Sequence, residues 1–66
     1  MSVILYTTGC PKCRVLEKKL ESKNIEYVKN TDTALMISKG FESVPMLEVD
    51  GEIMNFAVAN AWINIQ

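Results

Sequence analysis

Thr7-Thr8-Gly9-Cys10-Pro11-Lys12-Cys13-Arg14 holds both cysteines of the chain, two residues apart, between an apolar run and a helical pattern. The run before it, Val3-Ile4-Leu5-Tyr6, is typical of a buried strand. Pro11 suits the first turn of a helix, where its missing N–H costs nothing. The sequence therefore predicts a strand, a turn and a helix, with both sulfurs at the N-terminus of that helix.

The composition is that of one small domain, residues 1–66. A chain of 66 residues buries only about 60% of the surface that its unfolded form exposes. A formal charge of -1, without long runs of one sign, predicts no nucleic acid or membrane partner. No apolar stretch approaches the roughly 20 residues that span a bilayer, and the first residues lack the basic region of a signal peptide. We expect a cytoplasmic protein that works as a monomer.

The segment after the cysteines predicts an amphipathic helix. Cys13, Leu16 and Leu20 recur on one helical face, and the pattern ends near residues 22–24. Residues 25–29 are short and β-prone, with Ile25 and Tyr27 on one face. A strand, a helix and a strand in about 30 residues make a βαβ unit, so its two strands should be parallel.

The second half of the chain predicts two more helices and a hairpin. Asp50-Gly51 is a strong two-residue turn signal between strands at 44–49 and 52–54. A helix is expected at 33–39, with N-cap candidates at 30–32, Gly40 just past its end and Phe41 folding back onto it. Asn55 can cap a last helix that starts at Phe56. The predicted order is β-α-β-α-β-β-α.

The cysteine spacing suits thiol–disulfide exchange, which needs an attacking thiolate and a second thiol to resolve the mixed disulfide. Cys10, at the helix start, should be exposed, with its pKa lowered by the first-turn N–H groups and the helix dipole. Cys13 lies one turn along and should be partly buried beneath it. We therefore expect Cys10 to attack and Cys13 to resolve. Lys12 either adds positive charge near the thiolate or is a solvated side chain.

Two other features leave alternatives open. A zinc or iron–sulfur site needs about four ligands, and the chain offers one Cys-x-x-Cys and no histidine. A single chain is therefore not expected to bind such a metal, whereas a metal site formed jointly by two chains remains an alternative. Pro45, at the start of the third predicted strand, is compatible with a cis bond or with a trans proline as first strand residue.

Five segments, taken in order, resemble the glutaredoxin-like branch of the thioredoxin superfamily. They are Val3-Ile4-Leu5-Tyr6-Thr7, Cys10-Pro11-Lys12-Cys13, Gly40-Phe41, Ser43-Val44-Pro45 and Asp50-Gly51. The resemblance implies an α/β minimal thioredoxin fold, with a four-stranded mixed sheet of order 2-1-3-4 and three helices, the first and third on one face. It also implies a cis Val44–Pro45 bond facing the cysteines, and Val44 backbone groups that bind an extended peptide or glutathione.

Residues around the motif favour one branch of that family over another. Glutaredoxins that use glutathione usually carry an aromatic residue before the second cysteine and Gly-Gly after the fourth strand, where this chain has Lys12 and Met54-Asn55-Phe56. The short length and the Asn55-Phe56 helix start are similar to small redoxins that donate electrons to ribonucleotide reductase. Those redoxins are recharged by thioredoxin reductase. The reductant therefore stays open between glutathione, as co-substrate, and thioredoxin reductase.

Taken together, these features predict a thiol–disulfide oxidoreductase that reduces protein or small-molecule disulfides, with no tightly bound cofactor. Cys10 and Cys13 are the expected catalytic pair. A disulfide-containing protein is the expected partner, with ribonucleotide reductase as one candidate. The alternative is a non-catalytic binding module, or a dimeric iron–sulfur carrier that uses Cys10. The predicted substrate-binding residues are Val44, Pro45, Lys12 and Thr8.

Overall fold

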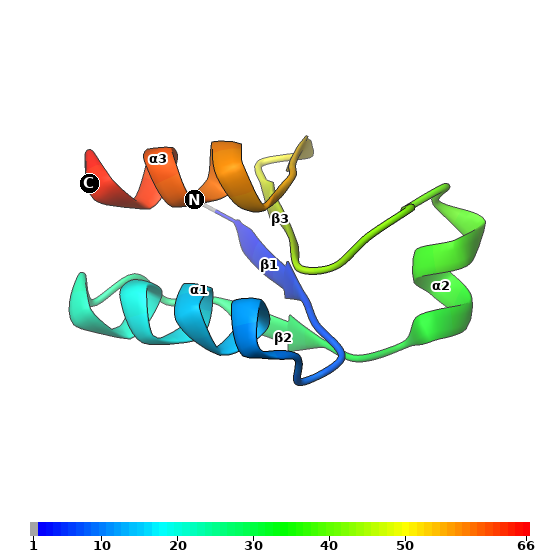
Figure 1. Ribbon diagram of the computed structural model, residues 1–66. Helices are drawn as coiled ribbons and strands as arrows, with labels where there is room; N and C mark the ends of the chain where they lie inside the picture. Colours follow the sequence, from blue (N-terminus) through cyan, green and yellow to red (C-terminus); the bar gives the residue numbers. More distant parts are fainter. Residues whose placement is uncertain (1) are drawn as a thin grey trace.

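A single mixed sheet of order β2-β1-β3-β4 forms the centre of the computed structural model, which describes residues 2–66 (Figure 1). The α/β class, the strand order and the three helices confirm the predicted topology. Within residues 2–66, none of the helices combines the length and the apolarity needed to cross a membrane. The elements are β1 Val3–Tyr6, α1 Pro11–Ser22, β2 Val28–Asn30, α2 Thr33–Ser38, β3 Met46–Val49, β4 Glu52–Met54 and α3 Phe56–Asn64.

The strand pairings follow from the connections between strands. β1 and β2 are joined through α1 and run parallel, with Ile4 opposite Val28. β3 returns antiparallel to β1, so that Tyr6 lies opposite Met46, and the tight turn at Asp50-Gly51 sets β4 antiparallel to β3. Consequently the end of β1 and the beginning of β3 meet at the same edge of the molecule.

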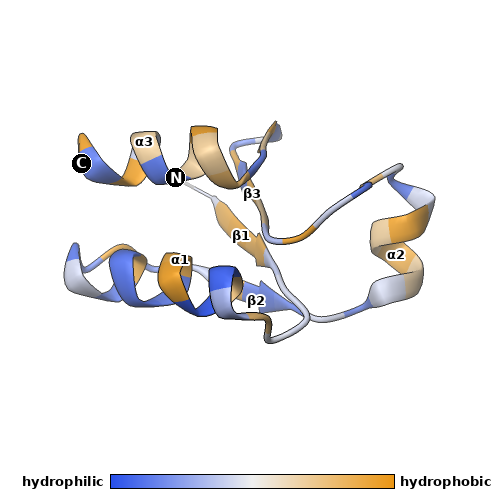
Figure 2. Ribbon diagram, viewed as in Figure 1, coloured by the Kyte–Doolittle hydropathy of each residue, from blue (hydrophilic) through white to orange (hydrophobic). Residues whose placement is uncertain are grey.

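α1 and α3 pack side by side and cover one face of the sheet (Figure 1). Every second residue of β1 and β3 points into this layer, where Leu16 and Leu20 of α1 meet Ala59 and Ile63 of α3. Figure 2 shows β1 in the apolar colour, and apolar segments interspersed with hydrophilic ones along α1. The core consists of Val3, Leu5, Leu16, Leu20, Leu47, Val49, Met54, Ala59 and Ile63.

The opposite face of the sheet meets the end of α2. Tyr6 points to this face, and its hydroxyl donates a hydrogen bond to Glu48 Oε1 over 3.1 Å. Lys39 lies 3.7 Å from the same carboxylate and 5.8 Å from the Tyr6 ring centroid. Phe41 packs edge-on against the Tyr6 ring, with centroids 5.1 Å apart. These contacts anchor the segment that follows α2 to the sheet.

The end of α2 has the predicted left-handed glycine. Gly40 has a φ of +80°, and the N–H groups of Gly40 and Phe41 donate to the carbonyls of Ile37 and Met36. This pair of bonds satisfies two carbonyls that the helix end would otherwise leave without partners. The helix itself ends at Ser38, one residue before the predicted end, and Lys39 caps it.

Two strands begin later than predicted. β2 begins at Val28 rather than at residue 25, because the N–H of Ile25 donates to the Leu20 carbonyl and closes the end of α1. Asn24, with a φ of +56°, makes the left-handed turn that this closure requires. β3 begins at Met46 rather than at residue 44, because Pro45 has no N–H to donate to a neighbouring strand.

Candidate functional site

Cys10 is the N-cap of α1, and its sulfur takes the place of the usual capping oxygen. Its backbone is extended, with φ −70° and ψ 164°, and Pro11 opens the helix. The backbone N–H of Cys13 donates to Cys10 Sγ over 3.2 Å. An N–H that the helix cannot use internally is thus directed at the first sulfur.

The two thiols differ in their access to solvent. Both are free, but Cys10 is half-buried, whereas Cys13 is 0% exposed. Cys13 lies on the same helical face as Leu16 and Leu20, which are equally buried. The order of the two thiols is the predicted one, although Cys10 is less exposed and Cys13 more deeply buried than expected: a molecule arriving from solvent reaches Cys10, and Cys13 lies behind it.

The pKa of Cys13 lies below its usual value. Burial is the largest single influence and raises the pKa, but hydrogen bonds with the Cys10 and Thr7 side chains, and with the backbone of Thr8 and Cys10, lower it further than burial raises it. One of these partners is the other thiol, so the two sulfurs interact directly. Cys13 therefore ionises more readily than a buried isolated thiol would.

Thr7 fixes the turn between β1 and α1, and it is not among the site residues predicted from the sequence. It is 2% exposed, and its Oγ1 accepts a hydrogen bond from the Gly9 N–H over 3.0 Å. Its own N–H donates to the Asn30 carbonyl. A threonine two residues before a turn glycine is the signal that would have indicated this role.

The Val44–Pro45 bond is cis, as the family resemblance implies. Tyr6 lies opposite Met46 in the antiparallel pair, so the residues after Tyr6 and those before Met46 leave the sheet at the same end. Pro45 is buried, and Val44 is half-buried. The structure thus brings Val44 and Pro45 to the end of the sheet where α1 and its cysteines begin.

Thr8 and Val44 line one shallow cavity of about 280 Å³ at this end. Its other walls come from α2 and the segment after it. Ile37 is 75% exposed there, so a large apolar side chain is already in contact with solvent. Of the predicted substrate-binding residues, the cavity includes Thr8 and Val44. The complete lining is Thr8, Thr33, Met36, Ile37, Phe41, Glu42, Ser43 and Val44.

Lys12 faces the start of α3 rather than this cavity. Its Nζ lies 5.5 Å from the centroid of the Phe56 ring, and its side chain is otherwise in solvent. A cation at this distance is attracted by the negative face of the ring. Phe56, which the sequence predicts as the first residue of the last helix, therefore belongs to the surroundings of the cysteine motif. This contact joins the first turn of α1 to the first turn of α3.

No group of three or more histidine, cysteine or acidic side chains within residues 2–66 is arranged to hold a metal ion. The two sulfurs supply two of the four ligands that a zinc or iron–sulfur site needs.

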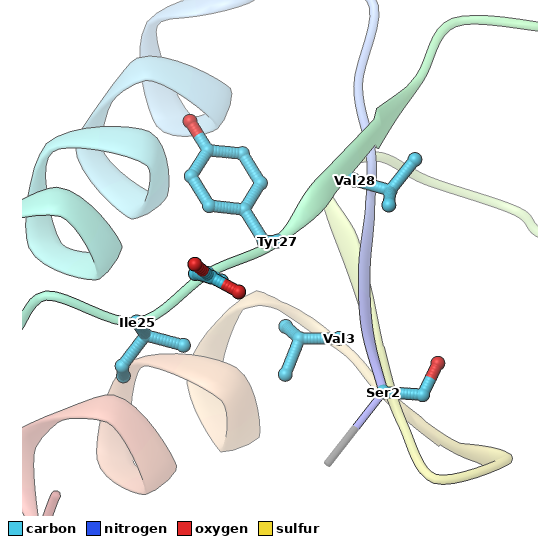
Figure 3. Close-up of a pocket in the computed structure, with 6 residues that line it drawn as sticks. Ser2, Val3, Ile25, Tyr27 and Val28 are labelled. Atoms are coloured by element: carbon cyan, nitrogen blue, oxygen red, sulfur yellow. The ribbon is translucent and has the colours of Figure 1, made fainter.

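A larger hollow of about 550 Å³ lies at the opposite end of the sheet (Figure 3). It forms where β2 begins late, between the start of β1 and the segment before Val28. Figure 3 shows Tyr27 pointing toward α1 and Val28 pointing away from it. The lining of this hollow includes one carboxylate, Glu26, and no thiol, so it offers fewer reactive groups than the end of the sheet that carries the cysteines. The lining residues are Ser2, Val3, Ile25, Glu26, Tyr27 and Val28.

The chain matches no model of a known protein family, and it matches no curated protein. The functional proposal below therefore depends on the geometry of the site and on the chemistry of its residues.

Proposed function

We propose that this protein is a thiol–disulfide oxidoreductase with a minimal thioredoxin fold of the glutaredoxin-like kind. One observation carries the proposal: Cys10 Sγ is accessible and accepts the Cys13 N–H at 3.2 Å, while Cys13 is fully buried one helical turn behind it. A solvent-accessible sulfur that accepts a backbone N–H, with a second thiol one helical turn behind it, has the arrangement that disulfide exchange requires.

The reaction proceeds in two exchanges. The Cys10 thiolate attacks one sulfur of a substrate disulfide, forming a mixed disulfide and releasing the other substrate sulfur as a thiolate that takes up a proton. Cys13, as its thiolate, then attacks Cys10 Sγ, and the second substrate thiol leaves. Two electrons have passed to the substrate, which is now two thiols, and the protein holds a Cys10–Cys13 disulfide.

Val44 and Pro45 form the wall against which the substrate lies. In this proposal, the Val44 backbone hydrogen-bonds an extended peptide beside Cys10, and Thr8 contacts the same peptide from the β1 side. Lys12 offers a positive charge beside the cysteine motif on the α3 side, outside the cavity that Val44 lines. Two molecules of glutathione, or a flavoprotein such as thioredoxin reductase, return the protein to its dithiol form in the cytoplasm, and ribonucleotide reductase is a candidate acceptor of its electrons.

A coupled turnover assay tests this proposal. NADPH oxidation is followed with insulin as disulfide substrate, once with glutathione and glutathione reductase and once with thioredoxin reductase. We expect wild-type turnover in at least one assay and none with Cys10→Ser. Turnover in the second assay alone would assign the protein to the redoxins that thioredoxin reductase recharges. The absence of turnover in both, or full activity of Cys10→Ser, would refute the proposal.

A further inference from the structure

An open groove runs from the redox turn along the outer side of α1. It has a volume of about 490 Å³ and is lined by Gly9, Pro11, Arg14, Val15 and Lys18. Gly9 and Pro11 flank Cys10 in the chain, so the groove begins at the turn that carries Cys10, although Cys10 itself does not line it. It is separate from the cavity between Thr8 and Val44, because the two share no lining residue.

The helix residues of this groove form one stripe. Pro11, Arg14, Val15 and Lys18 are spaced i, i+3, i+4 and i+7, which places them on a single helical face. The floor is apolar, since Val15 is 42% exposed and Pro11 lies beside it. Arg14 and Lys18 supply two positive charges, and both residues are exposed.

The acidic residues of α1 are occupied elsewhere. Glu17 forms an ion pair with Lys29, with 2.6 Å between Oε1 and Nζ, and Glu21 accepts a hydrogen bond from the Tyr27 hydroxyl. Both carboxylates therefore lie on the side of the helix that faces residues 27–29. The ion pairs found in residues 2–66 are Lys29–Glu17 and Lys39–Glu48, which use neither Arg14 nor Lys18. Within residues 2–66, Arg14 and Lys18 are thus two cations outside these ion pairs, on the helix that Cys10 caps.

We infer that this groove docks an acidic segment of the protein whose disulfide is reduced. The inference rests on the proposed function and adds the substrate class to it. From Pro11 to Lys18 the stripe extends about 10 Å along the helix axis, a length that an extended chain covers in about three residues. The partner therefore carries one or two carboxylates within about four residues of its attacked cysteine, with an apolar side chain between them on Val15.

Two reporter peptides and two double variants test this docking site. Both peptides contain the same disulfide, but one has Asp or Glu up to four residues from the cysteine and the other has Asn or Gln there. Arg14→Gln/Lys18→Gln removes two charges from the groove. The matched control Lys19→Gln/Lys23→Gln removes two charges from the same helix, where the lysines contact Asn64 and the Gln66 carbonyl instead.

We expect the groove variant to lower kcat/KM for the acidic peptide about three- to tenfold, as two exposed ion pairs would, and to leave the neutral peptide unchanged. The control variant should change the reduction of the two peptides equally. Added salt should remove the preference for the acidic peptide in the wild type. Equal reduction of both peptides by the wild type would overturn the docking site and leave the redox proposal intact.

Two further measurements test whether the groove itself binds the acidic segment. Titration with an acidic peptide whose cysteines are serines should shift the NMR amide signals of Gly9, Arg14, Val15 and Lys18, and it needs no redox activity. Shifts elsewhere, or none, would overturn the inference even if disulfide reduction is observed. A loss of glutathione disulfide reduction as large as the loss for the acidic peptide would show that the groove binds glutathione, and would also overturn it.

Discussion

The Cys13 N–H donates to Cys10 Sγ over 3.2 Å, although the two side chains differ completely in access: one is half-buried and the other is 0% exposed. The backbone of the buried residue thus stabilises the sulfur of the accessible one. In the proposed reaction this would separate the two stages of exchange in space, because a substrate would meet only the first sulfur and the second would be reached only from within the protein.

Alkylation should distinguish the two cysteines. Iodoacetamide at neutral pH should modify Cys10 at least about tenfold faster than Cys13, because the buried sulfur reacts only when the structure opens. Mass spectrometry of timed, acid-quenched samples gives both rates. In guanidinium chloride the two should react at similar rates, which is the control. Similar rates in the native protein would contradict the assigned roles.

The core layer between the helices and the sheet should carry most of the stability. Leu16→Ala should lower the free energy of unfolding by about 2–5 kcal/mol, because Leu16 is 0% exposed in the shared core. Val58→Ala, at a site that is 52% exposed on α3, should change it by no more than about 0.5 kcal/mol. Urea denaturation measures both.

If Leu16→Ala leaves too little folded protein for this measurement, Ile63→Val offers a milder test in the same core. It should cost about 0.5–1.5 kcal/mol. Equal effects of Leu16→Ala and Val58→Ala would show that α1 does not pack as described.

The fold follows from local patterns that survive into the tertiary structure. The apolar run before the cysteines, the helical period of Leu16 and Leu20, and the Asp50-Gly51 turn each specify an element through residues that lie within a few positions of one another. The start of β2 was mispredicted for the opposite reason. Ile25 is β-prone, but its N–H donates to the Leu20 carbonyl and closes α1 after the left-handed Asn24. The β-propensity of a residue does not indicate that its N–H is already bonded to a helix end.

The arrangement of the candidate site was predictable where its residues lie on one helical turn. The unequal burial of Cys10 and Cys13 follows from their positions at the helix start, which the sequence indicates. The contact of Lys12 with Phe56 joins residues 44 positions apart and has no local signature. The bond from Tyr6 to Glu48 likewise depends on strand register, which is known only once β1 and β3 are paired.

Gly40→Ala should destabilise the protein by about 1–2 kcal/mol through the backbone alone. Gly40 has a φ of +80°, where a Cβ is unfavourable, yet nothing lies within 4 Å of the position that a Cβ would occupy. Gly40→Asn should therefore cost less than Gly40→Ala, since asparagine tolerates this conformation better. Thermal or urea unfolding compares the variants. Equal losses for both would indicate a steric cause instead.

Tyr27 should make stability depend on pH in the alkaline range. Its hydroxyl donates to Glu21 Oε2 over 3.1 Å, and its pKa is raised to about 12, first by burial, then by the hydrogen bond to Glu21 and the negative charges of Glu21 and Glu17. An unfolded chain loses the same proton near pH 10. Between about pH 10 and 12 the unfolded state therefore binds fewer protons, and the free energy of unfolding falls as pH rises.

Tyr27→Phe removes this dependence, because phenylalanine has no proton to lose. Below pH 10 the wild type should be more stable than the variant by about 0.5–1.5 kcal/mol, the usual value of one hydrogen bond. The difference should shrink between pH 10 and 12, since only the wild type loses stability through Tyr27. Urea denaturation of both proteins at pH 8 and pH 11 measures it. The other titrating groups, Tyr6 and the lysines, are common to both proteins, so a difference that stays constant across this range would contradict the raised pKa of Tyr27.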